Sequence, residues 1–287
     1  MNKLYRSTAA KNAIFALYEE KLQSLKLAYE EVDIATSFGQ TRVIITGKAD
    51  GLPIVLFHGI NAGAPLTLEA VQGLASDYRL YAIDTIGQAT KSAENRIDIV
   101  GNDYGRWAIA VMTGLQLKRA RCIGISYGAY ILQKLVIENP DAVEKAIFVV
   151  PSGLVNGKIL PSLRRLSWPL MRFMMTKKEK HLRAFTKSFV PEDDTFMLRL
   201  QRLTLTGLYM DYRRPKLLQA ADVQHFHQPA YIMVADDDVF FPGREAIARA
   251  KAIFPNLADT HILRGARHMP GKEQYPEIEQ KLRAWLA

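Results

Sequence analysis

The chain has 287 residues, of which 48% are apolar and 23% charged, a composition typical of a folded globular protein and not of a disordered or fibrous one. Its formal net charge is +9, and its single cysteine, Cys122, excludes an internal disulfide framework and a thiolate-rich metal site. We find neither an apolar run long enough to span a bilayer nor a secretory signal, so we expect a cytoplasmic protein without a membrane span.

The first elements are a helix and a hairpin. Helical periodicity over residues 11–27 predicts an N-terminal helix, which is expected to pack on the domain or to mediate association. Two β-branched runs, 32–35 and 41–46, flank a turn at 37–40 that contains Gly39, and this pattern predicts a β-hairpin.

From there on, short apolar runs alternate with helical stretches. The runs that we expect to be strands are 53–57, 80–83, 122–125, 146–150, 231–234 and 261–263. The helical stretches lie around 68–74, 107–115, 127–138, 246–253 and 278–286. Alternation of this kind predicts an α/β fold with a mostly parallel, doubly wound sheet, in which chemistry occurs beyond the carboxyl ends of the strands.

A G-x-S-x-G pattern closes one strand and opens the next helix, with Ser126 between Gly124 and Gly128. A serine in this position occupies a tight turn that raises its hydroxyl above the sheet edge, and side chains in place of the two glycines would collide with neighbouring elements. We therefore expect Ser126 to be a nucleophile, which needs a base to remove its proton.

Of the six histidines, His268 has the best position for that base. It follows the last strand and precedes the last helix. The others are expected in structural roles: His58 as a hydrogen-bonding residue that fixes its loop, His181 as a solvated side chain, His225 and His227 as surface or core residues without a metal, and His261 at the start of the last strand.

Three adjacent acids, Asp236, Asp237 and Asp238, follow the strand at 231–234 and offer the carboxylate that orients such a base. The residues alone leave the choice among them open, and the acids not used are expected to cap the following helix. The loop after residue 57 can supply the backbone N–H of Ile60 to an oxyanion, together with the N–H of Tyr127.

Taken together, these landmarks resemble the α/β-hydrolase superfamily, and its carboxylesterase-like branch of bacterial serine hydrolases in particular. The likeness covers residues 30–287 and includes His58-Gly59, Asp84-Thr85-Ile86-Gly87 followed by Ser92, the Ser126 pentapeptide, Asp238 with Pro242, and Gly265-Ala266-Arg267-His268. The resemblance implies a sheet of about eight strands. It also implies that Asp238 is the triad acid, with Asp236 as the alternative, because members place this acid four residues before such a proline.

The resemblance also implies a division of the chain. Residues 1–29 are then an N-terminal helical extension, 30–150 and 229–287 form the core, and 151–228 are a helical cap, called the cap segment below. The cap segment carries 14 Lys and Arg against 6 Asp and Glu, but it matches no nucleic-acid-binding motif, so we expect a basic surface and no nucleic acid partner. Its methionines at 171, 174, 175, 197 and 210 form either an apolar roof over the site or a small core of the segment.

The expected function is hydrolysis of small-molecule carboxylic esters through an acyl-enzyme, by Ser126, His268 and Asp238, without metal or organic cofactor. Lactones and thioesters would use the same residues. A carbon–carbon bond hydrolase would also use them, with a cation such as Arg267 to bind a substrate carboxylate, although we expect Arg267 to point to solvent. A non-catalytic ligand receptor with this fold is the alternative from another class. Nothing in the sequence indicates an oligomeric state.

Overall fold

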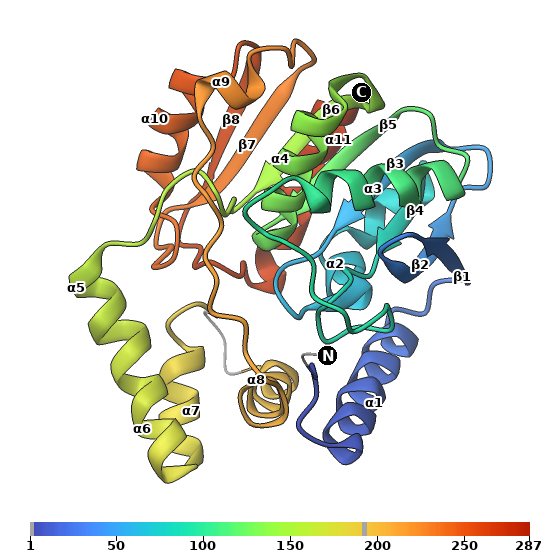
Figure 1. Cartoon of the computed structure of the whole chain (residues 1–287). Helices are drawn as coiled ribbons and strands as arrows, with labels where there is room; N and C mark the ends of the chain where they lie inside the picture. Colours follow the sequence, from blue (N-terminus) through green and yellow to red (C-terminus); the bar gives the residue numbers. More distant parts are fainter. Residues whose placement is uncertain (1–2, 191–193) are drawn as a thin grey trace.

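An eight-stranded sheet forms the centre of the structure, a computed structural model that describes residues 3–190 and 194–287 (Figure 1). The strands are β1 Tyr29–Thr36, β2 Gly39–Gly47, β3 Leu52–Phe57, β4 Tyr78–Ile83, β5 Ala120–Ile125, β6 Val143–Val149, β7 Ala230–Ala235 and β8 Leu257–Leu263. Their order is β1-β2-β4-β3-β5-β6-β7-β8; β2 is antiparallel to β1 and β4, and the other neighbours are parallel. The expected α/β-hydrolase architecture is confirmed.

Helices cover both faces of this sheet, which explains why its central strands are apolar throughout. The covering helices are α1 Thr8–Ser24, α2 Gly63–Val71, α3 Asp103–Gly114, α4 Tyr127–Glu138, α10 Gly243–Ile253 and α11 Tyr275–Leu286. One core lies between the sheet and α3, α4 and α10, and a second lies between the sheet and α1, α2 and α11. In β3, residues 54–57 are completely buried, as a strand that contributes to both cores must be.

The insertion between β6 and β7 is helical and lies beyond the carboxyl ends of the parallel strands (Figure 1). It contains α5 Ile159–Ser162, a π-helical turn Leu163–Ser167, α6 Trp168–Thr176, α7 Glu179–Thr186, α8 Thr195–Gly207 and α9 Ala220–Val223. Phe173, Leu182, Phe185 and Met197 belong to a separate apolar cluster that these helices share. Further along, Val223 and Phe226 are part of the core beneath the sheet, so the independent packing of the cap segment ends before residue 228.

The N-terminal extension packs on the rest of the molecule. Ser7 accepts a hydrogen bond from the N–H of Ala10 and thereby starts α1 three residues before the expected position. In Figure 1, α1 lies beside α8, and the Glu20 carboxylate forms a two-point ion pair of 2.7 and 2.8 Å with the Arg199 guanidinium. The extension therefore fastens the cap segment to the core. No helix in the described part of the chain is long and apolar enough to cross a membrane.

Candidate active site

Ser126 lies in a strained turn between β5 and α4. Its backbone has φ 54° and ψ −113°, a conformation that L-residues rarely adopt. A Cβ atom on Gly128 would lie 2.0 Å from the carbonyl oxygen of Phe57, and one on Gly124 would lie 2.5 Å from the carbonyl oxygen of Gly128. The two glycines therefore allow the close approach of strand and helix that holds Ser126 at the sheet edge.

The structure brings the three side chains of the expected triad into one chain of hydrogen bonds. The Oγ of Ser126 is 2.8 Å from Nε2 of His268, and Nδ1 of His268 is 2.7 Å from Oδ2 of Asp238. The side chain of Asp238 is 1% exposed and that of His268 is 10% exposed. Because the Asp238 carboxylate can only accept, it selects the tautomer with the proton on Nδ1, which leaves the Nε2 lone pair facing the Ser126 hydroxyl.

The two oxygens of Asp238 have separate tasks. While Oδ2 faces the imidazole, Oδ1 accepts the backbone N–H groups of Phe240 and Phe241 at 2.8 and 3.0 Å. The rings of both phenylalanines pack edge-on against His268, with centroid distances of 4.9 and 5.4 Å. Sequence reasoning did not assign a role to these two aromatic residues, because only the turn made by Asp238 brings them onto the imidazole.

The neighbouring acids and Arg267 have roles other than those expected. Asp236 is exposed, and the Asp237 carboxylate accepts a hydrogen bond of 2.6 Å from Arg165 of the cap segment. Neither acid caps α10, which begins without a side-chain cap. Arg267 donates to the Lys187 carbonyl and has its Nε 3.6 Å from Asp237, so it lies against the cap segment with its side chain 32% exposed, and it does not line the cavity described below.

The loop after β3 passes directly beside the Ser126 hydroxyl. A Cβ atom on Gly59 would be 4.0 Å from the Oγ of Ser126, which places the next residue, Ile60, at the same corner. Tyr127 is the first residue of α4, so its N–H has no carbonyl partner within the helix. The two amides that the sequence suggested as oxyanion donors thus belong to the two segments that meet at Ser126.

This loop is held rigidly by buried hydrogen bonds. His58 is fully buried; its Nδ1 is 2.6 Å from the Gly59 carbonyl, and its Nε2 accepts the N–H of Thr85 at 2.8 Å. Burial lowers the pKa of His58 to about 4, so the ring stays neutral and acts as a donor and an acceptor at once. Asn61 has φ 53°, and its N–H donates to the side chain of Gln88 at 2.7 Å.

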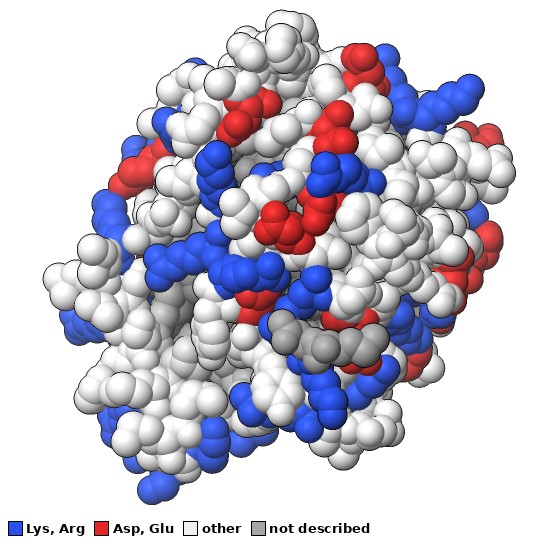
Figure 2. Space-filling model, viewed as in Figure 1, with Lys and Arg blue, Asp and Glu red and all other residues white. Residues whose placement is uncertain are grey.

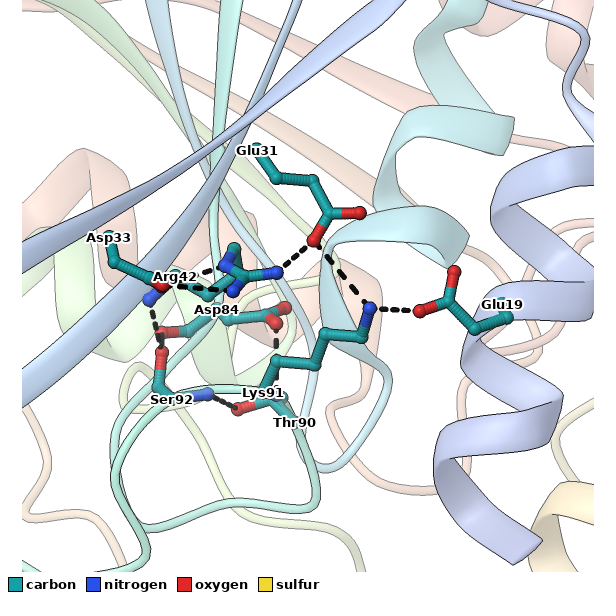
Figure 3. Close-up of polar contacts among 8 residues, drawn as sticks. All are labelled: Glu19, Glu31, Asp33, Arg42, Asp84, Thr90, Lys91 and Ser92. Carbon is teal, nitrogen blue, oxygen red and sulfur yellow. Dashed lines mark hydrogen bonds and ion pairs between the residues drawn. The ribbon is translucent and has the colours of Figure 1, made fainter. Parts of the chain in front are cut away.

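The segment that carries Thr85 and Gln88 is in turn fixed by the cluster in Figure 3. Asp84 is fully buried, and its carboxylate accepts the N–H groups of Ala64 and Lys91 at 2.9 and 3.1 Å. The Ser92 hydroxyl donates to the Asp84 carbonyl at 2.7 Å, and the Lys91 ammonium pairs with Glu19 of α1. The sequence landmark Asp84 to Ser92 is therefore a support for the loop that contains Ile60, and the N-terminal helix is tied to it.

A cavity of about 470 Å³ opens at Ser126 and His268, between the core and the cap segment. Its wall is mainly apolar; the contributors from the cap segment include Leu170, Phe185, Phe189, Val190, Met197, Leu200, Leu205 and Met210. The expected apolar roof of methionines is therefore present only in part. Met197 and Met210 face the cavity, whereas Met171, Met174 and Met175 are exposed on the outside.

The remaining histidines are structural, with two corrections. His181 is buried, not solvated, because it lies on the inner face of α7, where its Nδ1 is 2.8 Å from the Thr176 hydroxyl. His261 lies in the second half of β8, not at its start, and its Nε2 is 2.7 Å from the Glu277 carboxylate. His225 and His227 are both exposed, and no group of three or more possible metal ligands occurs among the described residues.

Comparison with known proteins agrees with the fold. The family model described as alpha/beta hydrolase fold matches residues 53–274. Two Bacillus subtilis (strain 168) proteins, the uncharacterized carboxylesterase nap and the carboxylesterase YbfK, are each 22% identical; the matches cover 93% and 95% of this chain and 90% and 93% of theirs. The crystal structure of the naproxen esterase (carboxylesterase NP) from Bacillus subtilis is similar with a TM-score of 0.85 at 19% identity, covering 98% of this chain and 100% of that one.

Proposed function

The chain belongs to the alpha/beta hydrolase fold family, and on that premise we propose that it is a serine carboxylesterase. The observation that carries the proposal is the unbroken hydrogen-bond chain from Ser126 through His268 to the buried carboxylate of Asp238, at the wall of an apolar cavity. The names of its Bacillus relatives, both carboxylesterases, support the same reaction.

In the proposed acylation step, Ser126 Oγ attacks the carbonyl carbon of the ester while Nε2 of His268, at 2.8 Å, takes the hydroxyl proton. Asp238 keeps the proton of Nδ1 in place and stabilises the positive charge that develops on the ring. The backbone N–H groups of Ile60 and Tyr127 donate to the oxygen that becomes negative in the tetrahedral intermediate. When that intermediate collapses, His268 gives its proton to the departing alcohol.

Deacylation repeats these steps with water. His268 removes a proton from a water molecule, which attacks the acyl carbon and releases the carboxylic acid and the free Ser126 hydroxyl. Packing of Phe240 and Phe241 on the imidazole limits access of bulk water to the base and holds its ring plane. The residues of the chain are sufficient for this chemistry. We place the activity in the cytoplasm, because the single cysteine of the chain is free and the fold does not depend on disulfides.

The cavity favours esters with apolar groups of small or medium size over charged substrates. Most of its lining from the cap segment is aliphatic or aromatic, which suits an acyl or alcohol group that leaves water on binding; Asp194 and Arg213 are the charged residues that the cap segment adds to the wall. For a carbon–carbon bond hydrolase, Arg267 is not the cation that would bind a substrate carboxylate, because it is engaged by the Lys187 carbonyl and does not line the cavity; Arg213 and Lys272 are the cations in its wall. Lactones and thioesters of similar polarity remain compatible with the same residues.

Hydrolysis of p-nitrophenyl acetate and p-nitrophenyl butyrate by the purified protein tests the proposal. We expect turnover by the natural chain and a loss of at least about 1000-fold in Ser126→Ala and in His268→Ala, because each removes a member of the proton relay. Thermal unfolding of each variant shows that the chain still folds. Equal rates in the natural chain and in Ser126→Ala would reject the esterase, and binding of esters without turnover would favour the receptor.

A further inference from the structure

The outer side of the cap segment presents an unusual row of exposed apolar side chains. Residues 159–176 form one continuous helical rod, from α5 through the π-helical turn to α6, with a length of about 27 Å. The exposed fractions reach 80% for Ile159, 78% for Met175 and 56% for Trp168. The full row, called the apolar ridge below, consists of Ile159, Leu160, Leu163, Trp168, Met171, Met174 and Met175.

The ridge cannot be explained as the inward side of an amphipathic helix. The inward side of α6 is formed by other residues: Phe173 is completely buried in the cluster of the cap segment, and Leu170 lines the ester cavity. The helix is therefore apolar on its outward side as well, where no other part of the described chain covers it. A contiguous exposed apolar patch of this kind marks an interaction surface.

Cations surround the apolar ridge. Residues 158–187 contain nine Lys and Arg but one acid, Glu179. Ion pairs join three of these cations to carboxylates: Lys158 with Glu245, Arg165 with Asp237, and Arg183 with Glu179. The other six are exposed, and no ion pair joins them to the described part of the chain; they are Arg164, Arg172, Lys177, Lys178, Lys180 and Lys187. Figure 2 shows the white surface of this region with blue side chains along its edge.

We propose that the apolar ridge and its cations dock the protein on the surface of a bilayer that contains anionic phospholipids. Leu, Ile and Met side chains enter the boundary between headgroups and acyl chains, where Trp168 also has a favourable position, while the cations contact lipid phosphates. The combination of an apolar row with a basic border is what interfacial helices require, since neither attraction alone gives stable binding.

A second copy of the chain fits this surface less well. A two-fold symmetric contact places the same patch on both sides, so the unpaired cations of one copy would face those of the other. A nucleic acid would pair with the cations but would leave the apolar ridge in water. The anionic bilayer is the partner that satisfies both parts of the surface.

Trp168 offers a reporter inside the proposed contact. The chain has three tryptophans, and Trp107 and Trp285 are buried with 0% and 3% exposure, so Trp168 is the one whose emission responds to a surface event. On addition of vesicles made of equal parts phosphatidylcholine and phosphatidylglycerol, we expect a blue shift of emission and quenching by brominated acyl chains. Vesicles of phosphatidylcholine alone are expected to bind much more weakly, and salt is expected to weaken the binding further.

Two sets of substitutions separate the contributions in a vesicle flotation assay. The triple variant Arg172→Gln, Lys177→Gln, Lys178→Gln is expected to lower the partition coefficient by about 100-fold, since each cation near an anionic surface contributes about fivefold. The matched control Lys118→Gln, Arg119→Gln, Lys251→Gln removes the same number of exposed cations elsewhere and is expected to bind like the natural chain within about twofold.

The apolar part is tested by Leu160→Gln with Met175→Gln, two exposed positions outside the cavity wall. We expect this variant to lose flotation and the Trp168 shift while it keeps its melting temperature and its hydrolysis of p-nitrophenyl acetate. Leu52→Gln with Val100→Gln, also exposed, is the matched control that is expected to float normally.

Equal vesicle binding by the cation variant and its control would overturn the proposal, as would the absence of any flotation by the natural chain. Association into dimers that the ridge substitutions abolish would assign the surface to a second copy of the chain. Binding of an RNA or DNA oligonucleotide that the cation substitutions weaken and the ridge substitutions leave intact would assign it to a nucleic acid. The docking proposal is independent of the esterase: if Ser126→Ala floats normally, docking stands whatever its activity, and an active protein that does not float contradicts docking alone.

Discussion

Replacement of Asp238 by asparagine separates orientation of the base from integrity of the loop. In the natural chain, Oδ1 holds the N–H groups of Phe240 and Phe241, and Oδ2 accepts from His268. The asparagine carbonyl can keep the first task, but its NH₂ group then faces Nδ1 of the ring. The ring must respond by accepting at Nδ1 and carrying its proton on Nε2, which points that proton at Ser126 and removes the base.

The size of the effect follows from this tautomer change. The equivalent substitution in a serine protease lowers kcat about 10⁴-fold, which corresponds to about 5.5 kcal/mol of activation free energy. Because both backbone hydrogen bonds of the loop are retained, the free energy of unfolding should fall by no more than about 1 kcal/mol. Asp238→Ala, by contrast, leaves the N–H groups of Phe240 and Phe241 without their acceptor and should lower the free energy of unfolding by about 1–3 kcal/mol more than Asp238→Asn does.

The assay is steady-state hydrolysis of p-nitrophenyl butyrate, paired with urea unfolding of each variant. Asp236→Asn is the matched control, since this exposed neighbour makes no contact with the base, and it should retain activity within about twofold of the natural chain. The reasoning would be refuted by an Asp238→Asn enzyme within tenfold of natural activity, or by a loss of similar size in Asp236→Asn.

Three further predictions concern packing and protonation. Gly128→Ala places a Cβ atom 2.0 Å from a backbone carbonyl oxygen of β3, and urea unfolding should show that it lowers the free energy of unfolding by about 3 kcal/mol. Gly265→Ala is the control: its φ is 68° but no atom lies within 4 Å of the added Cβ, so it should lower the free energy of unfolding by only about 1 kcal/mol. Equal losses in the two variants would contradict the argument. Burial lowers the pKa of His58 from 6.5 to about 4, so between these pH values the unfolded chain binds more protons, and His58 lowers the free energy of unfolding as pH falls. Burial raises the pKa of Asp84 from 3.8 to about 6, so between these pH values the folded chain binds more protons, and Asp84 raises the free energy of unfolding as pH falls. Asp84→Asn should therefore lose stability more steeply than the natural chain between pH 6 and 4, and parallel curves would show that this balance is absent. Burial also raises the pKa of the Cys122 thiol, so a chromogenic disulfide reagent should label it only after unfolding, and rapid labelling of the native protein would contradict its position.

Local rules explain why the strands and the strand-to-helix turn were predictable. The apolar runs of the central sheet are dictated by burial on both faces, and the turn at Ser126 depends on two glycines that are close in sequence and forced by backbone contacts. The choice of Asp238 over Asp236, in contrast, needed a family resemblance, because adjacent acids differ only in which one the loop turns inward.

The errors at Arg267, Asp237 and His181 arise from the packing of the cap segment, on the core and within itself. Arg267 and Asp237 face each other and Arg165 across that boundary, and His181 is buried among cap helices whose packing has no short-range sequence signal. The same reason hid the apolar ridge: periodicity identifies a helix with apolar residues, but only its neighbours decide which of them stay exposed.

The central claim is that Ser126 is activated by its contact with His268, and covalent labelling tests it most directly. The protein is treated with a fluorophosphonate, and the modified residue is located by peptide mass spectrometry. The account predicts one adduct per chain, on Ser126, with labelling abolished in Ser126→Ala and strongly slowed in His268→Ala. A natural chain that remains unlabelled, or an adduct on a different residue, would contradict it.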